Sequence, residues 1–303
     1  MSLISPRVLL DRLVGLGAIT ELPAGWRSNF FELVFRNRSL GWVHKSFENQ
    51  LSSKYFSLTP HQVELRGEVT QQDIDQIALD FYHQKLFTGW RDESYPALAL
   101  DGKREEMFYV ERAFAKVFGL VRHSIHVNGI VSEEEGKEIR IWMGKRSNTK
   151  SRFPGMLDNM VAGGLPRLMS PLECAVKECW EEASVPPQVS RAGLQLVGSL
   201  TRVGLEESDN RFVRLEEIFV FDLKLPKGEF TPVPYDGEVE NFLLCTGNEV
   251  MLHDANVKPD VLLVVADLML RRKLVSVNTA DEQASYLDLV RAMHPALPHK
   301  IIN

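Results

Sequence analysis

The residues of this sequence that are best suited to chemistry are three glutamates on one predicted helix, Glu178, Glu181 and Glu182. At about 100° per residue, their spacing places all three carboxylates within a sector of roughly 100° on the helix surface. Carboxylates this close repel one another and destabilise the helix unless a positive charge lies between them. Mg²⁺ prefers oxygen ligands and is commonly shared between a few carboxylates and the phosphates of a ligand. The spacing therefore indicates a site for a divalent metal ion and a phosphorylated compound.

A solvated acidic face is the simpler interpretation of three nearby glutamates, because runs of charge on helices are common. Local context favours the metal site instead. Ser170 and Glu173 form a capping-box pattern, and a proline directly after the serine marks the start of a helix over residues 171–183. Gly163 and Gly164 end an apolar stretch before this helix and allow a phosphate to approach the backbone closely. We therefore expect substrate phosphates to lie between the glycine pair and the glutamates.

The segment from Gly163 to Ser184 resembles the Nudix box, whose pattern is G-x5-E-x7-R-E-U-x-E-E-x-G-U, with U a bulky apolar residue. Alignment on the last two glutamates puts all three helix glutamates at the metal-binding positions of the box. Met169 replaces the first glutamate, Lys177 the arginine and Ser184 the final glycine. Serine in a left-handed helix cap costs up to about 1 kcal/mol relative to glycine, which affects the fold rather than the chemistry. The resemblance implies an α/β fold, a Nudix α/β/α sandwich with a mixed sheet, and a diphosphate hydrolase that uses Mg²⁺ or, alternatively, Mn²⁺.

Further blocks resemble one subgroup of this family, and the resemblance extends from residue 33 to residue 293. The blocks are RSNTKSRFPGMLDNMVAGGLP, HVNG, GWRDESYP, YDGEVENF and KPD. This subgroup carries an N-terminal domain of uncharacterised type and occurs in fungi, plants and bacteria. It also tolerates lysine for the arginine of the box and lacks the first glutamate, whereas Leu168 stands where we expect it to have glycine. The resemblance implies hydrolysis of thiamine diphosphate analogues, particularly oxidised, damaged forms, to the monophosphate.

Cationic residues outside the helix are expected to contact a diphosphate, which needs positive partners beyond the metal ion. Arg146 and Lys150 lie upstream of a Pro-Gly pair, at positions that resemble diphosphate-contacting residues of isopentenyl-diphosphate-isomerase-like Nudix proteins. Alternatively, Arg146 and Lys150 are ordinary surface charges with no contact to a substrate. Asp158, next to the strand that leads to Gly163, is expected to orient this loop.

A further acidic group from outside the helix is also expected, as a metal ligand or as a base. On one predicted strand, alternation allows only one of Glu216 and Glu217 to face the site, and we prefer Glu217 as the metal ligand because the subgroup resemblance keeps an acid there. Of Glu238 and Glu240 we prefer Glu238 as the catalytic group, because a loop after a glycine can move.

Trp90 is the aromatic residue that we expect to line the organic part of the substrate site. It lies in a loop bounded by glycine and proline, and loops on a rigid scaffold commonly carry binding residues. For other aromatic residues on alternating strands, a place in the core is the more common outcome. This expectation gives the N-terminal domain a role in specificity or as a lid.

The elements that must position these residues form two predicted domains, because 303 residues correspond to about two domains of ordinary size. The first, residues 1–120, is a smaller α+β domain, and the second, residues 121–303, is the Nudix hydrolase domain. The elements predicted in the first domain are a helix after Ser5, a hairpin over residues 30–44, and helices over residues 70–86 and 104–118. Those predicted in the second are a hairpin over residues 123–146, strands at 157–162, 194–201, 214–223 and 239–245, and helices at 171–183, 259–273 and 284–293.

Composition narrows the class of protein further. The formal net charge is -6, from 35 Lys plus Arg against 41 Asp plus Glu, so there is no general electrostatic reason to bind a nucleic acid. Three cysteines are too few for a disulfide framework, and no segment has the pattern of a secretory signal or a membrane span. We therefore expect a cytoplasmic enzyme that acts on a small molecule, with no nucleic-acid or membrane partner; a homo-oligomer is left open.

Two other functions fit the same sequence. A Nudix pyrophosphatase could act on a nucleoside diphosphate-X compound such as ADP-ribose or a dinucleotide, with AMP as a product. A degenerate box could also bind a metabolite without turning it over, and would then do so independently of metal.

Overall fold

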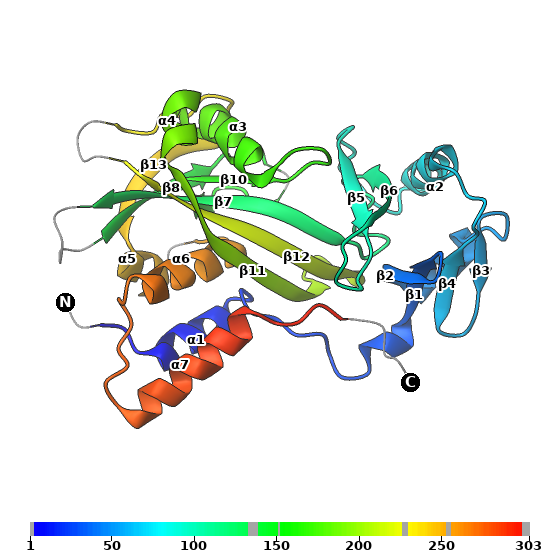
Figure 1. The fold of residues 1–303 in the computed structure, drawn as a ribbon, viewed down its shortest axis with the longest axis horizontal. Coiled ribbons are helices and arrows are strands. Elements are labelled where there is room, and N and C mark those ends of the chain that lie inside the picture. Colours follow the sequence, from blue (N-terminus) through cyan, green and yellow to red (C-terminus); the bar gives the residue numbers. More distant parts are fainter. Residues whose placement is uncertain (1–2, 133–138, 151, 226–229, 253–255, 299–303) are drawn as a thin grey trace.

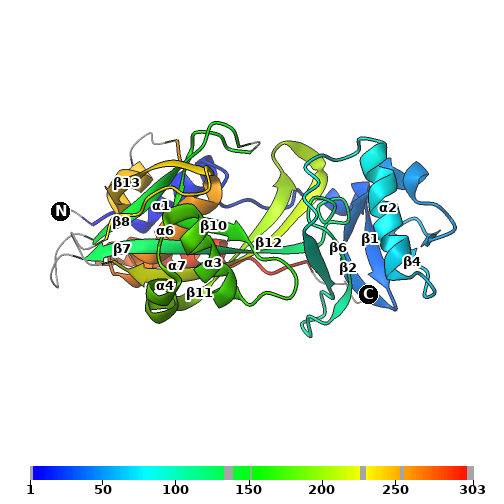
Figure 2. The ribbon, with the colours of Figure 1, turned by 90° about the horizontal axis from the view of Figure 1, so that it is seen from above.

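The computed structural model describes residues 3–132, 139–150, 152–225, 230–252 and 256–298. A large sandwich contains most of the C-terminal two thirds, and a smaller N-terminal sheet lies beyond one end of it (Figures 1 and 2). The fold is a mixed α/β architecture with a β-rich N-terminal region, as the sequence predicts. The division into domains at residue 120 stays a prediction, although strand β7 begins at Val121.

The large sheet has seven strands and mixed direction. In chain order they are β7 (Val121–Ser132), β8 (Ile139–Arg146), β9 (Leu157–Asn159), β10 (Val161–Gly164), β11 (Leu194–Glu206), β12 (Asp209–Lys224) and β13 (Val239–Thr246). The main path is β11-β12-β7-β8-β13, with β10 paired to β7 and β9 paired to β8. Strands β12 and β7 are parallel, whereas the other pairs are antiparallel. The turn predicted between β7 and β8 lies outside the described residues.

Helices cover both faces of this sheet (Figure 1). One face carries α3 (Pro171–Ala183) and α4 (Pro187–Gly193), and the other carries α1 (Pro6–Gly15), α5 (Gly247–Leu252), α6 (Pro259–Arg271) and α7 (Ala280–Met293). Ile125 and Val127 of β7 pack with Cys179 of α3 in one core. Leu9 and Leu13 of α1 join the core on the opposite face. The predicted α/β/α sandwich is confirmed, and its second helical layer includes the first helix of the chain.

The N-terminal region forms a four-stranded sheet in the order β2-β1-β4-β3 and a separate two-stranded sheet. Its elements are the 3₁₀ helices η1 (Trp26–Asn29) and η2 (Lys45–Gln50), strands β1 (Phe30–Phe35), β2 (Arg38–His44), β3 (Phe56–Leu58), β4 (Gln62–Leu65), β5 (Ser94–Leu98) and β6 (Glu106–Glu111), and helix α2 (Gln71–His83). The predicted hairpin corresponds to β1 and β2. Helix α2 begins after a capping box between Thr70 and Asp73.

The predicted helix over residues 104–118 is wrong. Residues 106–111 form strand β6, which pairs antiparallel with β5, and turns follow as far as Gly119. The segment EMFYVE alternates in burial along the strand, as a half-buried strand does, and its partner decides between strand and helix.

Close backbone contact joins the N-terminal sheet to the start of β7. A Cβ atom on Gly41 would lie 2.3 Å from the carbonyl oxygen of Phe118, and the Trp42 N–H donates to that oxygen at 2.9 Å. Phe30 and Trp42 pack there against Val121 and other apolar residues of the large sheet. Among the described residues, no helix has the length and apolar character that crossing a membrane requires.

Candidate active site

Helix α3 begins where the sequence pattern places it. The Ser170 hydroxyl accepts a hydrogen bond from the Glu173 N–H at 3.2 Å, and the Glu173 carboxylate accepts one from the Ser170 N–H at 3.3 Å. The helix ends at Ser184, whose φ of 53° lies in the left-handed region. Leu168 has a left-handed φ of 66°, and its side chain is 88% exposed. Both residues that stand in place of an expected glycine therefore adopt a backbone conformation that glycine adopts with less strain.

Two of the three helix glutamates face strand β10. A Cβ atom on Gly163 would lie 2.6 Å from Cδ of Glu178, so only glycine leaves room for this carboxylate. Glu182 accepts a hydrogen bond from the Ala162 N–H at 2.9 Å and is 5% exposed. Burial raises the pKa of Glu178 and raises the pKa of Glu182 well above its ordinary value, and the charge of Glu178 adds to the effect on Glu182. Both carboxylates therefore lie where ionisation is costly without a nearby cation.

Glu181 forms an ion pair with Lys177 on the more exposed side of α3, and the same ammonium group lies 3.4 Å from the Glu178 carboxylate. Burial acts to lower the pKa of Lys177, but the bond to Glu181 and the charge of Glu178 raise it to about 12. Lys177, which replaces the arginine of the box, thus neutralises part of the negative charge of the stripe of glutamates on α3 (Glu178, Glu181 and Glu182).

The loop before β13 is fixed against the end of α3. The Asp236 N–H donates to the Glu181 carbonyl at 3.1 Å, and the Asp236 carboxylate accepts from the Glu238 N–H at 2.8 Å. The Ser147 N–H donates to the Glu238 carbonyl at 2.9 Å. This loop, which we expected to be free to move, is therefore held by backbone hydrogen bonds on both sides of Glu238.

Glu238 lies within electrostatic reach of the helix carboxylates. Burial acts to raise its pKa, but the ion pair with Lys150 and the charge of Arg91 lower it. The negative charge of Glu238 in turn raises the pKa values of Glu178 and Glu182. The loop that is bonded to the end of α3 thus carries Glu238, and Glu238 holds the other predicted site residue, Lys150, by an ion pair.

Arg146 is bound within its own loop. Its Nη1 donates to the Asp158 carboxylate at 2.7 Å, its Nε to the Phe153 carbonyl at 3.1 Å and its Nη2 to the Arg152 carbonyl at 3.2 Å. Asp158 also accepts from Lys258 at 2.9 Å. All three guanidinium nitrogens therefore have partners, so the geometry supports a role for Arg146 in shaping the loop rather than the predicted contact with a diphosphate.

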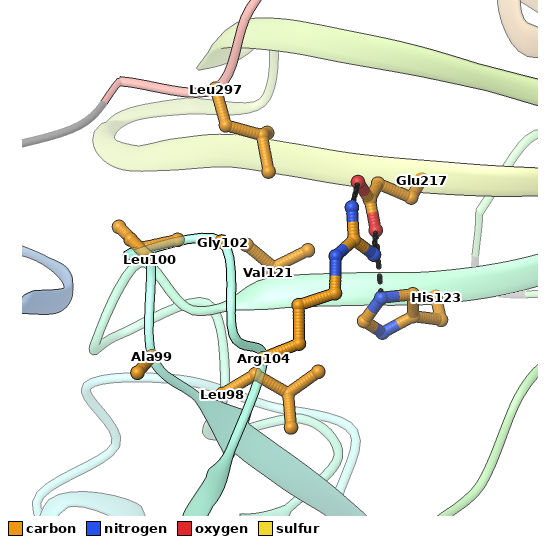
Figure 3. Close-up of a pocket in the computed structure, with 9 residues that line it drawn as sticks. All are labelled: Leu98, Ala99, Leu100, Gly102, Arg104, Val121, His123, Glu217 and Leu297. Carbon is orange, nitrogen blue, oxygen red and sulfur yellow. Dashed lines mark hydrogen bonds and ion pairs between the residues drawn. The ribbon is translucent and has the colours of Figure 1, made fainter.

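Glu217 lies in a separate pocket (Figure 3). Arg104 donates to both of its carboxylate oxygens, one of which also bonds His123 Nε2 at 2.9 Å. Burial acts to raise the pKa of Glu217, but these two partners lower it to about 2. The other residues that line the pocket are Leu98, Ala99, Leu100, Gly102, Val121 and Leu297. Because Arg104 occupies both oxygens, the geometry does not support Glu217 as a metal ligand; this glutamate instead links the N-terminal region to the large sheet.

Trp90 packs against the core of the N-terminal region. Its ring stacks on Phe87 with centroids 6.3 Å apart, and its Nε1 donates to Asp92 at 2.7 Å. The residue of this loop whose charge reaches the site is the neighbouring Arg91. The predicted contact between Trp90 and a substrate therefore stays a prediction.

Two residues that the sequence does not single out lie against Gly164. A Cβ atom on this glycine would be 2.0 Å from Oη of Tyr95 and 2.8 Å from Nη2 of Arg112. Gly164 therefore makes room for side chains of the N-terminal region, as Gly163 does for Glu178, and the predicted approach of substrate phosphates to this glycine pair stays a prediction. The one available signal is that Tyr95 belongs to the block GWRDESYP; Arg112 has none.

A divalent cation fits the donor set on α3. Among the residues that the structure describes, no group of three or more His, Cys, Asp or Glu side chains is arranged to hold a metal ion. Mg²⁺ does not need such a group, because it is usually bound through one or two carboxylates together with water and substrate phosphates. Glu178 and Glu182 supply two carboxylates, and a cation would offset the cost of ionising both.

Comparison with known proteins identifies the family of the chain. A model of the NUDIX domain matches residues 122–264. An uncharacterized protein of Saccharomyces cerevisiae, YJR142W, is 33% identical over 275 residues, which are 84% of this chain and 78% of that protein. Nudix hydrolase 24, chloroplastic, of Arabidopsis thaliana is 32% identical over 280 residues, which are 87% of this chain and 72% of that protein. Among solved structures, DR0079 from Deinococcus radiodurans has a TM-score of 0.42 at 17% identity, over 58% of this chain and 98% of that chain.

The two relatives match far more of the chain than the domain alone, so the similarity includes much of the N-terminal region. Nudix hydrolases generally use divalent metal ions and act on small phosphorus-containing anhydrides. The chain belongs to the Nudix hydrolase family and is a hydrolase of phosphorus-containing anhydrides.

Proposed function

We propose that the chain hydrolyses a small organic diphosphate, thiamine diphosphate or one of its oxidised analogues, to the monophosphate and inorganic phosphate. We propose Mg²⁺ as the metal ion, with Mn²⁺ as an alternative. The observation that carries the diphosphate assignment is the placement of Glu178 and Glu182 beside the glycine pair of β10. The choice of thiamine compounds is supported by the sequence blocks that resemble the subgroup active on them, several of which form parts of this site.

The residues of the site have separate roles in this proposal. A bound Mg²⁺ ion would neutralise charge that develops on the phosphates and lower the pKa of an attacking water. Glu178 and Glu182 would hold the ion, whereas Glu181, the third predicted metal ligand, keeps Lys177 beside these carboxylates. Gly163 keeps the Glu178 carboxylate close to the strand. Because the protein mainly positions the reactants, no covalent nucleophile is required.

Glu238 is the proposed acceptor of the proton that the water loses. Its pKa is lowered, so it is ionised at neutral pH, and its loop is fixed against α3. Lys150 is the proposed contact to a substrate phosphate, because its ion pair with Glu238 holds it beside the carboxylates. Arg146 supports the same loop from within.

We propose two further properties. Residues 1–120 act as a specificity domain, which the contacts of Tyr95 and Arg112 with Gly164 support. The compartment is the cytoplasm, with support from three cysteines that are all free thiols; the names of the two Arabidopsis relatives describe those proteins as chloroplastic.

The test is a substrate panel on the full chain, with thiamine diphosphate, its oxidised analogues, ADP-ribose and a dinucleotide. Each compound is assayed with Mg²⁺, with a chelator, and with the Glu182→Gln variant. We expect orthophosphate release from the thiamine compounds with Mg²⁺ alone. Glu68→Gln, which changes an exposed glutamate of the N-terminal region, is the control and should keep full activity.

The panel separates this proposal from its rivals. Formation of AMP from ADP-ribose or a dinucleotide, with no turnover of the thiamine compounds, would replace the proposed substrate. Binding without turnover, unaffected by the chelator, would support a non-catalytic protein. Full activity of Glu182→Gln would contradict the role of the α3 carboxylates.

A further inference from the structure

Arg112 is held in one orientation by residues of its own region. It follows strand β6, and its N–H donates to the Glu93 carbonyl at 2.8 Å. Its Nη1 donates to the Glu93 carboxylate at 2.7 Å, and its guanidinium lies 5.6 Å from the centroid of the Tyr95 ring. Both hydrogen bonds go to Glu93, one from the backbone N–H of Arg112 and one from Nη1, so Nη2 on the other side of the guanidinium is not used by Glu93.

This other side of the guanidinium lies at the end of strand β10. Nη2 of Arg112 and the hydroxyl of Tyr95 occupy the space that a side chain on Gly164 would fill. The carboxylate of Glu178 occupies the corresponding space at Gly163. The end of this strand is therefore flanked by a carboxylate of the metal helix and by a cation of the N-terminal region.

Both donors at Gly164 are unused. Within the part of the chain that the structure describes, neither Nη2 of Arg112 nor the Tyr95 hydroxyl has a hydrogen-bond partner, although Tyr95 is 4% exposed. Burial raises the pKa of Tyr95 to about 12, so its hydroxyl stays protonated and can donate. Both groups can therefore donate to a ligand that enters beside Gly164.

The charge of Arg112 reaches the stripe of α3 without a direct ion pair. It counteracts the rise in the pKa of Cys174 that burial causes, and the charge of Glu178 raises the pKa of Arg112 itself. Cys174 and Glu178 are one helical turn apart on the same side of α3. Because Gly163 and Gly164 are adjacent, an anion held by Arg112 at the end of β10 would lie near a metal ion held by Glu178.

We propose that Arg112 and the Tyr95 hydroxyl bind phosphate oxygens of the substrate, so that the N-terminal region completes the Nudix active site. This inference rests on the proposed action on a diphosphate. It fills a place that the predicted cation Arg146 does not fill, because all three guanidinium nitrogens of Arg146 have partners in its own loop. Planar guanidinium groups match phosphate geometry, and one held beforehand loses little entropy on binding.

The test is calorimetric binding of inorganic pyrophosphate to the full chain in the presence of Mg²⁺. We expect Arg112→Ala to weaken binding by about 10- to 100-fold, the value of one charge-assisted hydrogen bond. Arg112→Lys should recover part of the loss, and added guanidinium ion should recover part of it in Arg112→Ala. In turnover assays Arg112→Ala should also lower kcat/KM. Its Tm should fall no more than that of a variant that loses a comparable ion pair elsewhere.

Arg167→Ala is the matched control. Arg167 bonds Glu106 at 2.7 Å and lies 4.4 Å from the centroid of the Tyr109 ring, so its removal also breaks an ion pair and a cation–π contact between the two regions. Its side chain is 28% exposed, against 33% for Arg112. We expect a similar change in unfolding temperature and unchanged pyrophosphate affinity.

Equal pyrophosphate affinity of the wild type and Arg112→Ala would overturn the inference, as would equal weakening by Arg167→Ala. The readout needs no turnover, so it is separate from the proposed function. Failure of the wild type to cleave thiamine compounds would refute their assignment while leaving the Arg112 measurement valid.

Discussion

The Glu182→Gln substitution should make the metal-free protein more stable while it removes the response to Mg²⁺. Glu182 is buried, and the negative charges of Glu178, Asp158 and Glu238 disfavour its ionised form. Its one hydrogen bond, from the Ala162 N–H, can be accepted equally by the carbonyl oxygen of a glutamine. The variant thus keeps the shape and this bond, removes the charge, and places an amide NH2 where the second carboxylate oxygen was.

The magnitude follows from the cost of a buried, poorly compensated charge. We expect a gain of about 2 kcal/mol in the free energy of unfolding at neutral pH, which corresponds to a rise of roughly 3 °C in Tm for a chain of this length. Because the folded-state pKa of Glu182 is raised, the wild type loses stability as the pH rises above the ordinary value of 4.5. The advantage of the variant should therefore grow with pH above this value and vanish below it.

Bound Mg²⁺ should make the wild type more stable than the Glu182→Gln variant. At about 100 times its Kd, an ion that binds only the folded state stabilises the wild type by about 2.7 kcal/mol. Differential scanning calorimetry with and without Mg²⁺, between pH 5 and pH 8, measures both effects, and Glu68→Gln serves as the exposed control. Equal stabilisation of the wild type and the variant by Mg²⁺, or a metal-free variant no more stable than the wild type at pH 8, would refute the reasoning.

Other substitutions test the surroundings of α3 and the joint with the N-terminal region. Leu168→Gly should raise the free energy of unfolding by about 0.5–1 kcal/mol, because it removes a left-handed strain and little packing; a thermal melt with unchanged or lower Tm contradicts this. Gly163→Ala should lower kcat/KM roughly 100-fold by displacing the Glu178 carboxylate, whereas Gly67→Ala, in open space, should not. Glu206→Gln should cost about 3–5 kcal/mol in urea unfolding, because it removes the carboxylate that pairs with buried Arg214 and leaves this arginine only the more exposed Glu207. Arg122 and Arg214 hold the pKa of Glu206 well below 4.5, so its contribution is present above that pH and is lost below it, and the cost should shrink in acid; a pH-independent difference is the contrary result.

Helix α3 and its glutamates were predictable because their signals are local. The capping box joins residues three positions apart, and helical phase alone places Glu178 and Glu182 on one side. The same phase cannot show that Glu181 pairs with Lys177 instead of facing β10. Which partner each glutamate of α3 contacts depends on the strand and side chains that pack against the helix.

Residues that depend on distant partners were not predictable. Glu217 was a reasonable acidic candidate on an alternating strand, but Arg104, 113 positions away in sequence, takes both of its oxygens. The segment 106–111 became a strand because β5 pairs with it, which no pattern inside the segment reveals. Arg112 lacks any motif, since its significance arises only from contact with Gly164.

The N-terminal and C-terminal regions contact each other at several places beyond the segment that connects them. The sequence alone therefore cannot test a domain boundary at residue 120. Helix α1 comes from the first region, yet Leu9 and Leu13 pack in the core under α6 and α7. Conversely, β5 and Arg112 of the N-terminal region contact the end of β10 in the large sheet. A boundary drawn where the sequence changes character therefore cuts a hydrophobic core and separates β5 and Arg112 from the strand that they contact, because both contacts join segments distant in sequence.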